Sequence, residues 1–232
     1  MAIDRLSGIL TPPITFVPHP IPEFFSPMRP KIAVCSFWFS GHQELADATT
    51  PNKEAYCELH GYDYWFECKE EWGPADKLRI MRMLLDDYDA ALWIDCDAFF
   101  ANPSFKIEAL IDHTKCAVLT ITRDGYDYAV NSGVFLMERW DETLQFLDWA
   151  LQPEIFAQIQ QYPLKDQDIL AKFAVEYPEL TRILPQRMMN SYLRAEYEVY
   201  NYPWSDYQPG DWILHAAGLP MEKRIAIAKK YA

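Results

Sequence analysis

The chain has 232 residues, of which 50% are hydrophobic and 15% aromatic, enough to bury a sizeable core in one domain and to exclude wholesale disorder. A formal net charge of −13 gives a surface that repels phosphate backbones and anionic lipid head groups, which argues against nucleic-acid binding and membrane-surface binding. Five cysteines without C-x-x-C spacing indicate neither a disulfide framework nor a zinc ribbon, so we expect buried thiols in a reducing compartment.

Residues 1–30 are expected to form a proline-rich extension of a single domain that spans residues 31–232. Seven prolines between positions 11 and 30 oppose a helix and favour an extended strap packed along the domain, and a proline-rich ligand for a partner protein is the alternative. No run of about eighteen apolar residues occurs, so we expect neither a signal peptide nor a membrane anchor. These features predict a soluble cytoplasmic protein without a transmembrane segment.

From Lys31 onwards, strand and helix patterns alternate. The first predicted helix begins at Pro51, because proline is favoured in the first turn, and it is stopped by Gly61. The second has apolar residues recurring on one face from about Asp76, and the strand after it ends at Asp95. In chain order, the predicted elements are a strand at 32–36, a helix at 51–59, a strand at 62–66, a helix from about 76 and a strand at 90–94.

This alternation predicts an α/β fold with a Rossmann-like, mostly parallel central sheet and flanking helices. Open sheets of this type bind ligands at the carboxyl ends of their strands, which is where Asp95 and Asp97 lie. The second half of the chain is less regular. It carries strand patterns near 116–121 and 134–137, helix patterns near 141–151 and 166–173, and a tyrosine-rich loop at 192–207.

Three D-x-D triplets occur in the sequence, and only one follows a fully apolar strand. The triplet at 87–89 joins a helix to a strand, where solvated turn carboxylates are ordinary, and the triplet at 166–168 opens a helix, where aspartate is favoured by capping. Asp95-Cys96-Asp97 instead lies between Trp93 and two phenylalanines. Two carboxylates in such surroundings repel each other and resist desolvation unless a cation or strong donors compensate.

A divalent cation is the simplest compensation for this carboxylate pair, and two exposed carboxylates at a strand end are the alternative. His215 ends another apolar stretch, and the small residues 216–218 after it let a ligand approach the backbone. A single histidine of this kind is most often a core residue, but beside two carboxylates it is a suitable third ligand. An imidazole ligand shifts the preference from Mg²⁺ towards Mn²⁺.

The chain resembles glycosyltransferase family 34, whose catalytic domain has the GT-A fold. This family contains fungal galactosyl- and mannosyltransferases and plant xyloglucan xylosyltransferases. The resemblance runs from about residue 31 to 220. The matching segments, in chain order, are Asn52-Lys53, Tyr56-Cys57, His60-Gly61-Tyr62-Asp63-Tyr64, Lys77-Leu78-Arg79, Trp93-Ile94-Asp95-Cys96-Asp97-Ala98, Asn131-Ser132-Gly133, Phe135-Leu136, Asp166-Gln167, Met189-Asn190-Ser191-Tyr192, Gly210-Asp211, His215 and Gly218.

The resemblance implies a retaining transfer of a sugar from a nucleoside-diphosphate sugar to a glycan hydroxyl, with a UDP-sugar favoured and GDP-mannose as the alternative. It implies a nucleotide-binding half at 31–100 and an acceptor half at 101–232. Asp95, Asp97 and His215 would hold Mn²⁺, or Mg²⁺, with Asp95 also touching the donor. The other implied roles are donor binding by Lys77, Ser132, Gly133 and Gly218, and catalysis beside the anomeric carbon by Asn131, Asp166 and Gln167.

The sequence departs from the family in two places. Relatives usually carry a membrane anchor, which we do not expect here, and they place a lysine for the diphosphate soon after the glycine that follows the histidine. Here the first basic residues after Gly218 are Lys223 and Arg224, and either is a candidate for that contact. Without the resemblance, Lys77 would be interpreted as a solvated helix lysine and Asp166 as a helix cap.

The acceptor is expected to bind among tyrosines and a tryptophan of the second half, which offer flat faces to sugar rings. They are Tyr192, Tyr197, Tyr200, Tyr202, Trp204 and Tyr207. Two other functions are alternatives: a non-catalytic module that binds nucleotide sugars, and a phosphohydrolase with Asp95 as nucleophile. The second is disfavoured because Asp95 follows the third predicted strand rather than the first.

Overall fold

The computed structural model describes residues 8–14, 29–111, 117–124, 129–193 and 206–232. A six-stranded sheet in the order β2-β1-β3-β6-β5-β7 forms its centre, and only β6 runs antiparallel to its neighbours. The predicted α/β fold with a mostly parallel sheet is therefore confirmed. The strands are β1 (Ile32–Trp38), β2 (Asp63–Cys68), β3 (Ala90–Ile94), β5 (Leu119–Thr122), β6 (Asn131–Glu138) and β7 (Thr181–Leu184).

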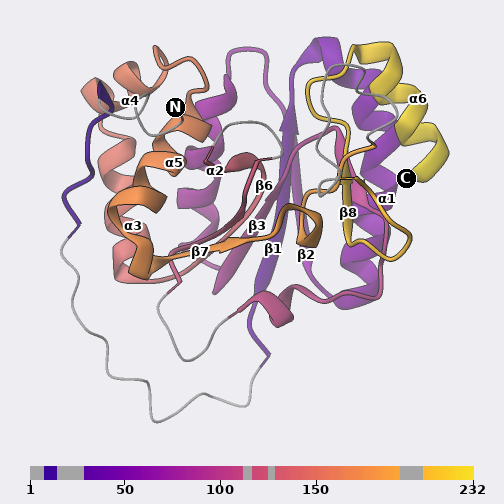
Figure 1. Cartoon of the computed structure of the whole chain (residues 1–232), viewed down its shortest axis with the longest axis horizontal. Coiled ribbons are helices and arrows are strands. Elements are labelled where there is room, and N and C mark those ends of the chain that lie inside the picture. The colour runs from indigo at the N-terminus through magenta and orange to yellow at the C-terminus, as the bar shows by residue number, and fades with distance from the viewer. Residues whose placement is uncertain (1–7, 15–28, 112–116, 125–128, 194–205) are drawn as a thin grey trace.

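Helices cover both faces of this sheet (Figure 1). The α-helices are α1 (Gln43–His60), α2 (Lys77–Leu84), α3 (Asp141–Ala150), α4 (Pro153–Ile159), α5 (Asp166–Glu176) and α6 (Met221–Tyr231). The 3₁₀ helices are η2 (Ser40–His42), η3 (Pro74–Asp76), η4 (Ile107–Leu110), η5 (Pro178–Leu180) and η6 (Gln186–Met188).

Alternate residues of β1 enter the two hydrophobic cores, as the pleat of a strand requires. Ala33 and Cys35 pack with side chains of α2, α3 and α5, whereas Ile32 and Val34 pack with Tyr56 of α1. In the described residues α6 lies outside α1 and packs against it. The cores thus hold the carboxyl ends of β1 and β3 between two helical layers.

A second, two-stranded sheet pairs β4 (Ala98–Phe100) with β8 (Ile213–His215) in antiparallel register. Ala98 lies opposite His215 in this pairing. The residue before β4 is Asp97, so the small sheet brings the end of the D-x-D segment to a histidine far away in the sequence.

The first predicted helix was placed wrongly at its start. Helix α1 begins at Gln43, and Pro51 lies inside it with its ring exposed. A proline inside a helix removes one hydrogen bond. Buried residues nevertheless recur on one face both before Pro51, at Leu45 and Thr49, and after it, at Lys53, so packing on that face carries the helix past the proline. Its end was predicted correctly, because Gly61 has a left-handed conformation with φ of 65°.

The expectation that all cysteines are buried is wrong at one position. Cys35 and Cys57 are buried and Cys96 is half-buried, but Cys68 is exposed. Cys68 is the last residue of β2, which forms one edge of the sheet and has a neighbouring strand on one side only. Cys116 lies outside the described residues.

The described part of the N-terminal extension packs as a strap on the α4–α5 side of the domain (Figure 1). Ile9 is buried in the main core, and the backbone N–H groups of Leu10 and Ile14 donate to the hydroxyls of Tyr162 and Tyr177 over 3.3 Å. Residues 15–28, with most of the prolines, lie outside the described residues.

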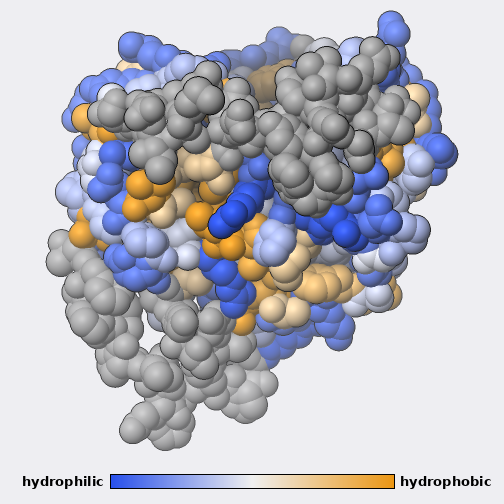
Figure 2. All heavy atoms as spheres, in the orientation of Figure 1, coloured by the Kyte–Doolittle hydropathy of each residue, from blue (hydrophilic) through white to orange (hydrophobic). Residues whose placement is uncertain are grey.

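Among the helices that are described, none has the length and apolarity to cross a membrane. Figure 2 shows hydrophobic and hydrophilic residues side by side in the middle of the face viewed, with mostly hydrophilic residues around its margin.

Candidate functional site

A cavity of about 520 Å³ opens at the carboxyl ends of β1 and β3. Its wall also includes the first residue of α2, the start of β6, the start of α5 and the segment after β8. Ten of the residues predicted for the site line it, and Lys223 does not. The ten are Lys77, Asp95, Asp97, Asn131, Ser132, Gly133, Asp166, Gln167, His215 and Gly218.

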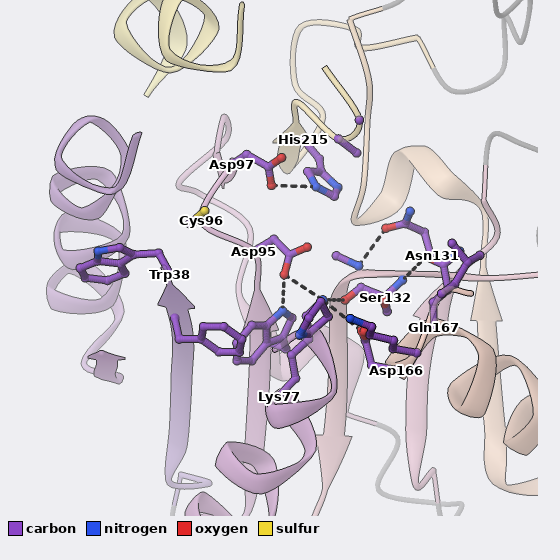
Figure 3. A pocket seen from close by; sticks show the side chains of 18 of the residues that line it. Trp38, Lys77, Asp95, Cys96, Asp97, Asn131, Ser132, Asp166, Gln167 and His215 are labelled. Atoms are coloured by element: carbon purple, nitrogen blue, oxygen red, sulfur yellow. Dashed lines mark hydrogen bonds and ion pairs between the residues drawn. The ribbon is translucent and has the colours of Figure 1, made fainter. Parts of the chain in front are cut away.

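At one end of the cavity, Asp97 and His215 face each other with 3.0 Å between Oδ1 and Nε2 (Figure 3). The backbone fixes both residues, because the N–H of Ala216 donates to the carbonyl of Asp97 over 3.0 Å. The second oxygen of Asp95 points towards them, and one ligand atom from each of the three residues lies within 4.8 Å of the others. Two carboxylates and an imidazole are a donor set that suits Mn²⁺, so these residues fit a divalent cation.

A chain of amides orients the imidazole of His215. The side-chain oxygen of Asn190 lies 2.7 Å from Nδ1, and the Asn190 amide group donates to the side-chain oxygen of Asn131 over 2.7 Å. With the Asn190 amide turned this way, Nδ1 is the donor, and Nε2 is the ring nitrogen on the Asp97 side that would take a cation. Asn131 is itself fixed by the N–H of Gly133 over 2.9 Å. Asn131 therefore acts in this structure as a positioning residue.

Gly133 leaves room for this imidazole. A Cβ built at this glycine would lie 2.1 Å from Cε1 of His215 and 2.9 Å from the Asn131 side-chain oxygen. We expect Gly133→Ala to displace the imidazole, to lower the free energy of unfolding by about 1–3 kcal/mol and to weaken Mn²⁺ binding. Thermal melts with and without Mn²⁺ measure both effects. The control is Gly41→Ala, where no atom lies within 4 Å, and an Mn²⁺ response equal to wild type would contradict the expectation.

Helix α1 supports the D-x-D turn from below. The Thr49 hydroxyl donates to the carbonyl of Cys96 over 2.7 Å, and the Lys53 ammonium donates to the carbonyl of Asp95 over 2.9 Å. The Asn52 side-chain amide donates to the carbonyl of Phe100 over 3.0 Å, and its oxygen accepts from the N–H of Phe100 over 2.8 Å. Burial lowers the pKa of Lys53 to about 8, although nearby carboxylates favour its charged form. The Asn52-Lys53 motif thus fixes the backbone that carries the carboxylate pair.

A second ionic cluster lies at the other end of the cavity (Figure 3). The Lys77 ammonium lies 3.0 Å from Asp95 Oδ1 and 3.1 Å from Asp166 Oδ2, and it donates to the carbonyl of Ser132 over 3.2 Å. Its side chain is 7% exposed, so it is not a solvated helix lysine. Burial lowers the pKa of Lys77, but the two carboxylates outweigh burial and hold it above its usual value. The Trp93 indole N–H also donates to Asp95 Oδ1, over 2.7 Å.

Gln167 is oriented by bonds at both ends of its amide. The N–H of Ser132 donates to its oxygen over 3.2 Å, and its amide nitrogen donates to Asp124 Oδ2 over 3.4 Å. Asp166 is almost fully buried, whereas Gln167 is half-buried in the cavity wall. Lys165, just before them, has φ of 49° and is the one non-glycine residue of the described chain with positive φ. Backbone strain of this kind is concentrated at functional sites.

Of the two basic residues after Gly218, the structure brings Arg224 to the cavity. Its Nη1 lies 3.1 Å from Asp97 Oδ2, and its Nε donates to the carbonyl of Leu219 over 2.6 Å. Burial raises the pKa of Asp97, but His215, Arg224 and Lys53 outweigh burial and hold it below its ordinary value.

One wall of the cavity is aromatic, which was not expected from the sequence. Phe37, Trp38 and Phe39 line it, and Trp38 stacks on Phe66 with ring centroids 5.7 Å apart. Three aromatics in a row at the carboxyl end of a strand are a signal that would have found them. His42 also lines the cavity, and burial and Arg224 lower its pKa while Asp97 opposes them.

Most of the aromatic residues predicted to bind the acceptor lie outside the described part of the chain. Positions 197, 200, 202 and 204 lie outside the described residues. Tyr192 is buried and meets the His215 ring edge-on with centroids 5.9 Å apart, and Tyr207 meets Tyr231 edge-on. Neither is among the residues that line the cavity.

Comparison with known sequences supports the resemblance. The sequence profile of the galactosyl transferase GMA12/MNN10 family matches residues 32–125. An uncharacterized alpha-1,2-galactosyltransferase of Schizosaccharomyces pombe (strain 972) is 24% identical over 221 residues, a match that covers 75% of this chain. The match covers 63% of the yeast protein, so this chain spans less than two thirds of that relative.

Two solved structures share the fold. A glycosyltransferase involved in the glycosylation of the major capsid of PBCV-1 superposes with a TM-score of 0.67 and 19% identity, over 87% of this chain and 100% of that one. The galactosyltransferase LgtC, solved with donor and acceptor sugar analogs, superposes with a TM-score of 0.50 and 12% identity, over 86% of this chain and 96% of that one. At these identities the likeness shows the fold alone, which is the GT-A fold.

Proposed function

We propose that this chain, which resembles glycosyltransferase family 34 and has the GT-A fold, is a metal-dependent retaining glycosyltransferase. The sequence and structural comparisons support glycosyl transfer as the general activity. The donor would be a nucleoside-diphosphate sugar, with a UDP-sugar favoured over GDP-mannose, and the acceptor a glycan hydroxyl. One observation carries the proposal: a cavity with an Asp-Asp-His cluster at one end and a Lys-Asp-Gln cluster at the other.

In this proposal Asp95, Asp97 and His215 hold Mn²⁺, with Mg²⁺ as the alternative. When bound there, the cation offsets the charge that develops on a departing diphosphate. Asn190 and Asn131 keep the imidazole turned so that Nε2 is available, and Lys53 holds the backbone of the D-x-D turn. The protein therefore presents its ligands already oriented.

The other end of the cavity would bind the transferred sugar. The Lys77 ammonium links Asp95 to Asp166, so the metal end and the sugar end share one charged group. Asp166 supplies a carboxylate that can stabilise an oxocarbenium-like centre or act as a nucleophile. Gln167 presents an amide held by Ser132 and Asp124, which suits a group that positions the anomeric carbon. Gly218 leaves room beside the backbone for the donor, and Gly133 leaves room for the imidazole that would hold the cation.

Thermal melts with a panel of UDP, GDP and their sugars, in Mn²⁺ or in chelator, test the binding part of this proposal. We expect the nucleotides of one base, uracil or guanine, to stabilise the protein, and only when Mn²⁺ is present. The free energy of unfolding should rise by about 2.7 kcal/mol at a ligand concentration 100 times the Kd. A product assay with the stabilising sugar nucleotide then tests turnover. No stabilisation by any nucleotide would overturn the proposal, and binding without transfer or hydrolysis would indicate a non-catalytic module.

A further inference from the structure

Arg224 contacts the same carboxylate that would hold the metal. The guanidinium lies 3.1 Å from Asp97 Oδ2, while Asp97 Oδ1 faces His215 at 3.0 Å. Both oxygens of Asp97 are thus engaged, and the carboxylate is 7% exposed. A divalent cation that binds at Asp97 must therefore compete with Arg224 or share the carboxylate with it.

We infer that Arg224 exchanges partners: it pairs with Asp97 in the metal-free protein and with the diphosphate of the donor in the complex. The inference rests on the proposed function. A divalent cation and a guanidinium on one carboxylate carry three positive charges against one negative charge, so they repel each other unless a second anion binds with them. A diphosphate supplies that anion, and the planar fork of arginine matches the geometry of phosphate oxygens.

Two buried lysines near this end already have other partners. Lys77 lies between Asp95 and Asp166, and Lys53 lies below the D-x-D turn with bonds to the Asp95 carbonyl and to Ser36. Arg224 instead lines the cavity with 23% of its side chain exposed. It is therefore placed both to release Asp97 and to meet a ligand in the cavity.

The space for a diphosphate lies beside Arg224. Ala217 and Gly218 line the cavity next to His215, and no atom lies within 4 Å of the position that a Gly218 Cβ would take. The backbone of Arg224 is fixed in the first turn of α6 by its N–H bond to the carbonyl of Pro220. The guanidinium can thus change partner by side-chain rotation, without movement of the helix.

Partner exchange makes binding of metal and diphosphate cooperative, and it gives Arg224→Gln two effects of opposite sign. The variant frees Asp97, so Mn²⁺ alone should bind several-fold tighter. It also removes a phosphate contact, so UDP or GDP at saturating Mn²⁺ should bind about tenfold weaker, while UMP or GMP, with one phosphate, should change little. A guanidinium that only stabilises α6 would weaken both ligands alike.

The experiment measures Mn²⁺ binding by electron paramagnetic resonance and nucleotide binding by calorimetry. The variants are Arg224→Gln and Arg224→Lys, with Lys229→Gln, an exposed lysine of the same helix, as the matched control. Arg224→Lys keeps a charge without the fork and should lose less of the diphosphate preference. Melting temperatures verify that each variant is folded.

An unchanged preference for diphosphate over monophosphate in Arg224→Gln would overturn the inference, as would the same loss appearing in Lys223→Gln instead. Both outcomes leave the proposed function standing. If the wild-type protein bound neither UDP nor GDP with Mn²⁺, the proposed function and this inference would fail together.

Discussion

Asp97→Asn is expected to abolish Mn²⁺-dependent nucleotide binding and to lower the rate of sugar transfer by at least about 10³-fold, since loss of one group that stabilises transition-state charge already costs 10²–10³ in kcat. Asp97 is buried and meets both His215 and Arg224. Asparagine keeps its shape but loses the charge that a divalent cation requires. Thermal melts with UDP or GDP in Mn²⁺ measure binding, and a product assay measures transfer.

The matched control for this variant is Asp87→Asn, which belongs to another D-x-D triplet of the chain. Asp87 is exposed in the turn between α2 and β3 and is not among the residues that line the cavity. It should behave as wild type.

The Asp97→Asn variant leaves Arg224 without its carboxylate, so a loss of about 1–3 kcal/mol in the free energy of unfolding is also expected. Full transfer by a folded Asp97→Asn variant would remove the metal site from the mechanism.

The sequence was sufficient to identify the carboxylate pair because its signal is local. An apolar strand that ends in two carboxylates is recognisable from Trp93 to Asp97 alone. The third member of the cluster, His215, was a candidate from its place at the end of an apolar stretch, but its proximity to the pair is created by the pairing of β4 with β8. A three-residue strand carries too little periodicity to be predicted from sequence.

Positioning residues are harder to predict than ligands. Asn190 appeared only as part of a matching segment, yet its amide sets the orientation of His215. Asp124 was not selected at all, although it bonds to Gln167 across two elements. Such roles depend on which side chains meet across the folded chain, and neither spacing nor composition records that.

The errors in the predicted elements have the same origin. Pro51 is a good first-turn residue in isolation, but the buried face of α1 extends to both sides of it, so tertiary packing overrode the local signal. The sequence left both Lys223 and Arg224 as candidates for the contact with the diphosphate. The two are neighbours in the first turn of α6, and only the direction of that turn decides which of their side chains lines the cavity.

Asp166→Asn should lower transfer and donor hydrolysis by about 10²–10⁴-fold while leaving Mn²⁺-dependent binding of the nucleoside diphosphate unchanged. Asp166 forms an ion pair with Lys77 at one end of the cavity, away from Asp97 and His215 (Figure 3). An amide cannot stabilise positive charge at the anomeric centre or form a glycosyl ester as a carboxylate does. Steady-state rates and calorimetry on one preparation separate the two effects.

The folded state should tolerate this variant, because Lys77 keeps its bond to Asp95 and because burial already raises the pKa of Asp166. Glu154→Gln, in the exposed first turn of α4, is the control for loss of one acidic group at a helix start, and it should leave the rate unchanged. A wild-type rate in Asp166→Asn would exclude this carboxylate as nucleophile and as charge stabiliser. The amide of Gln167, oriented by Ser132, would then be the group to test next.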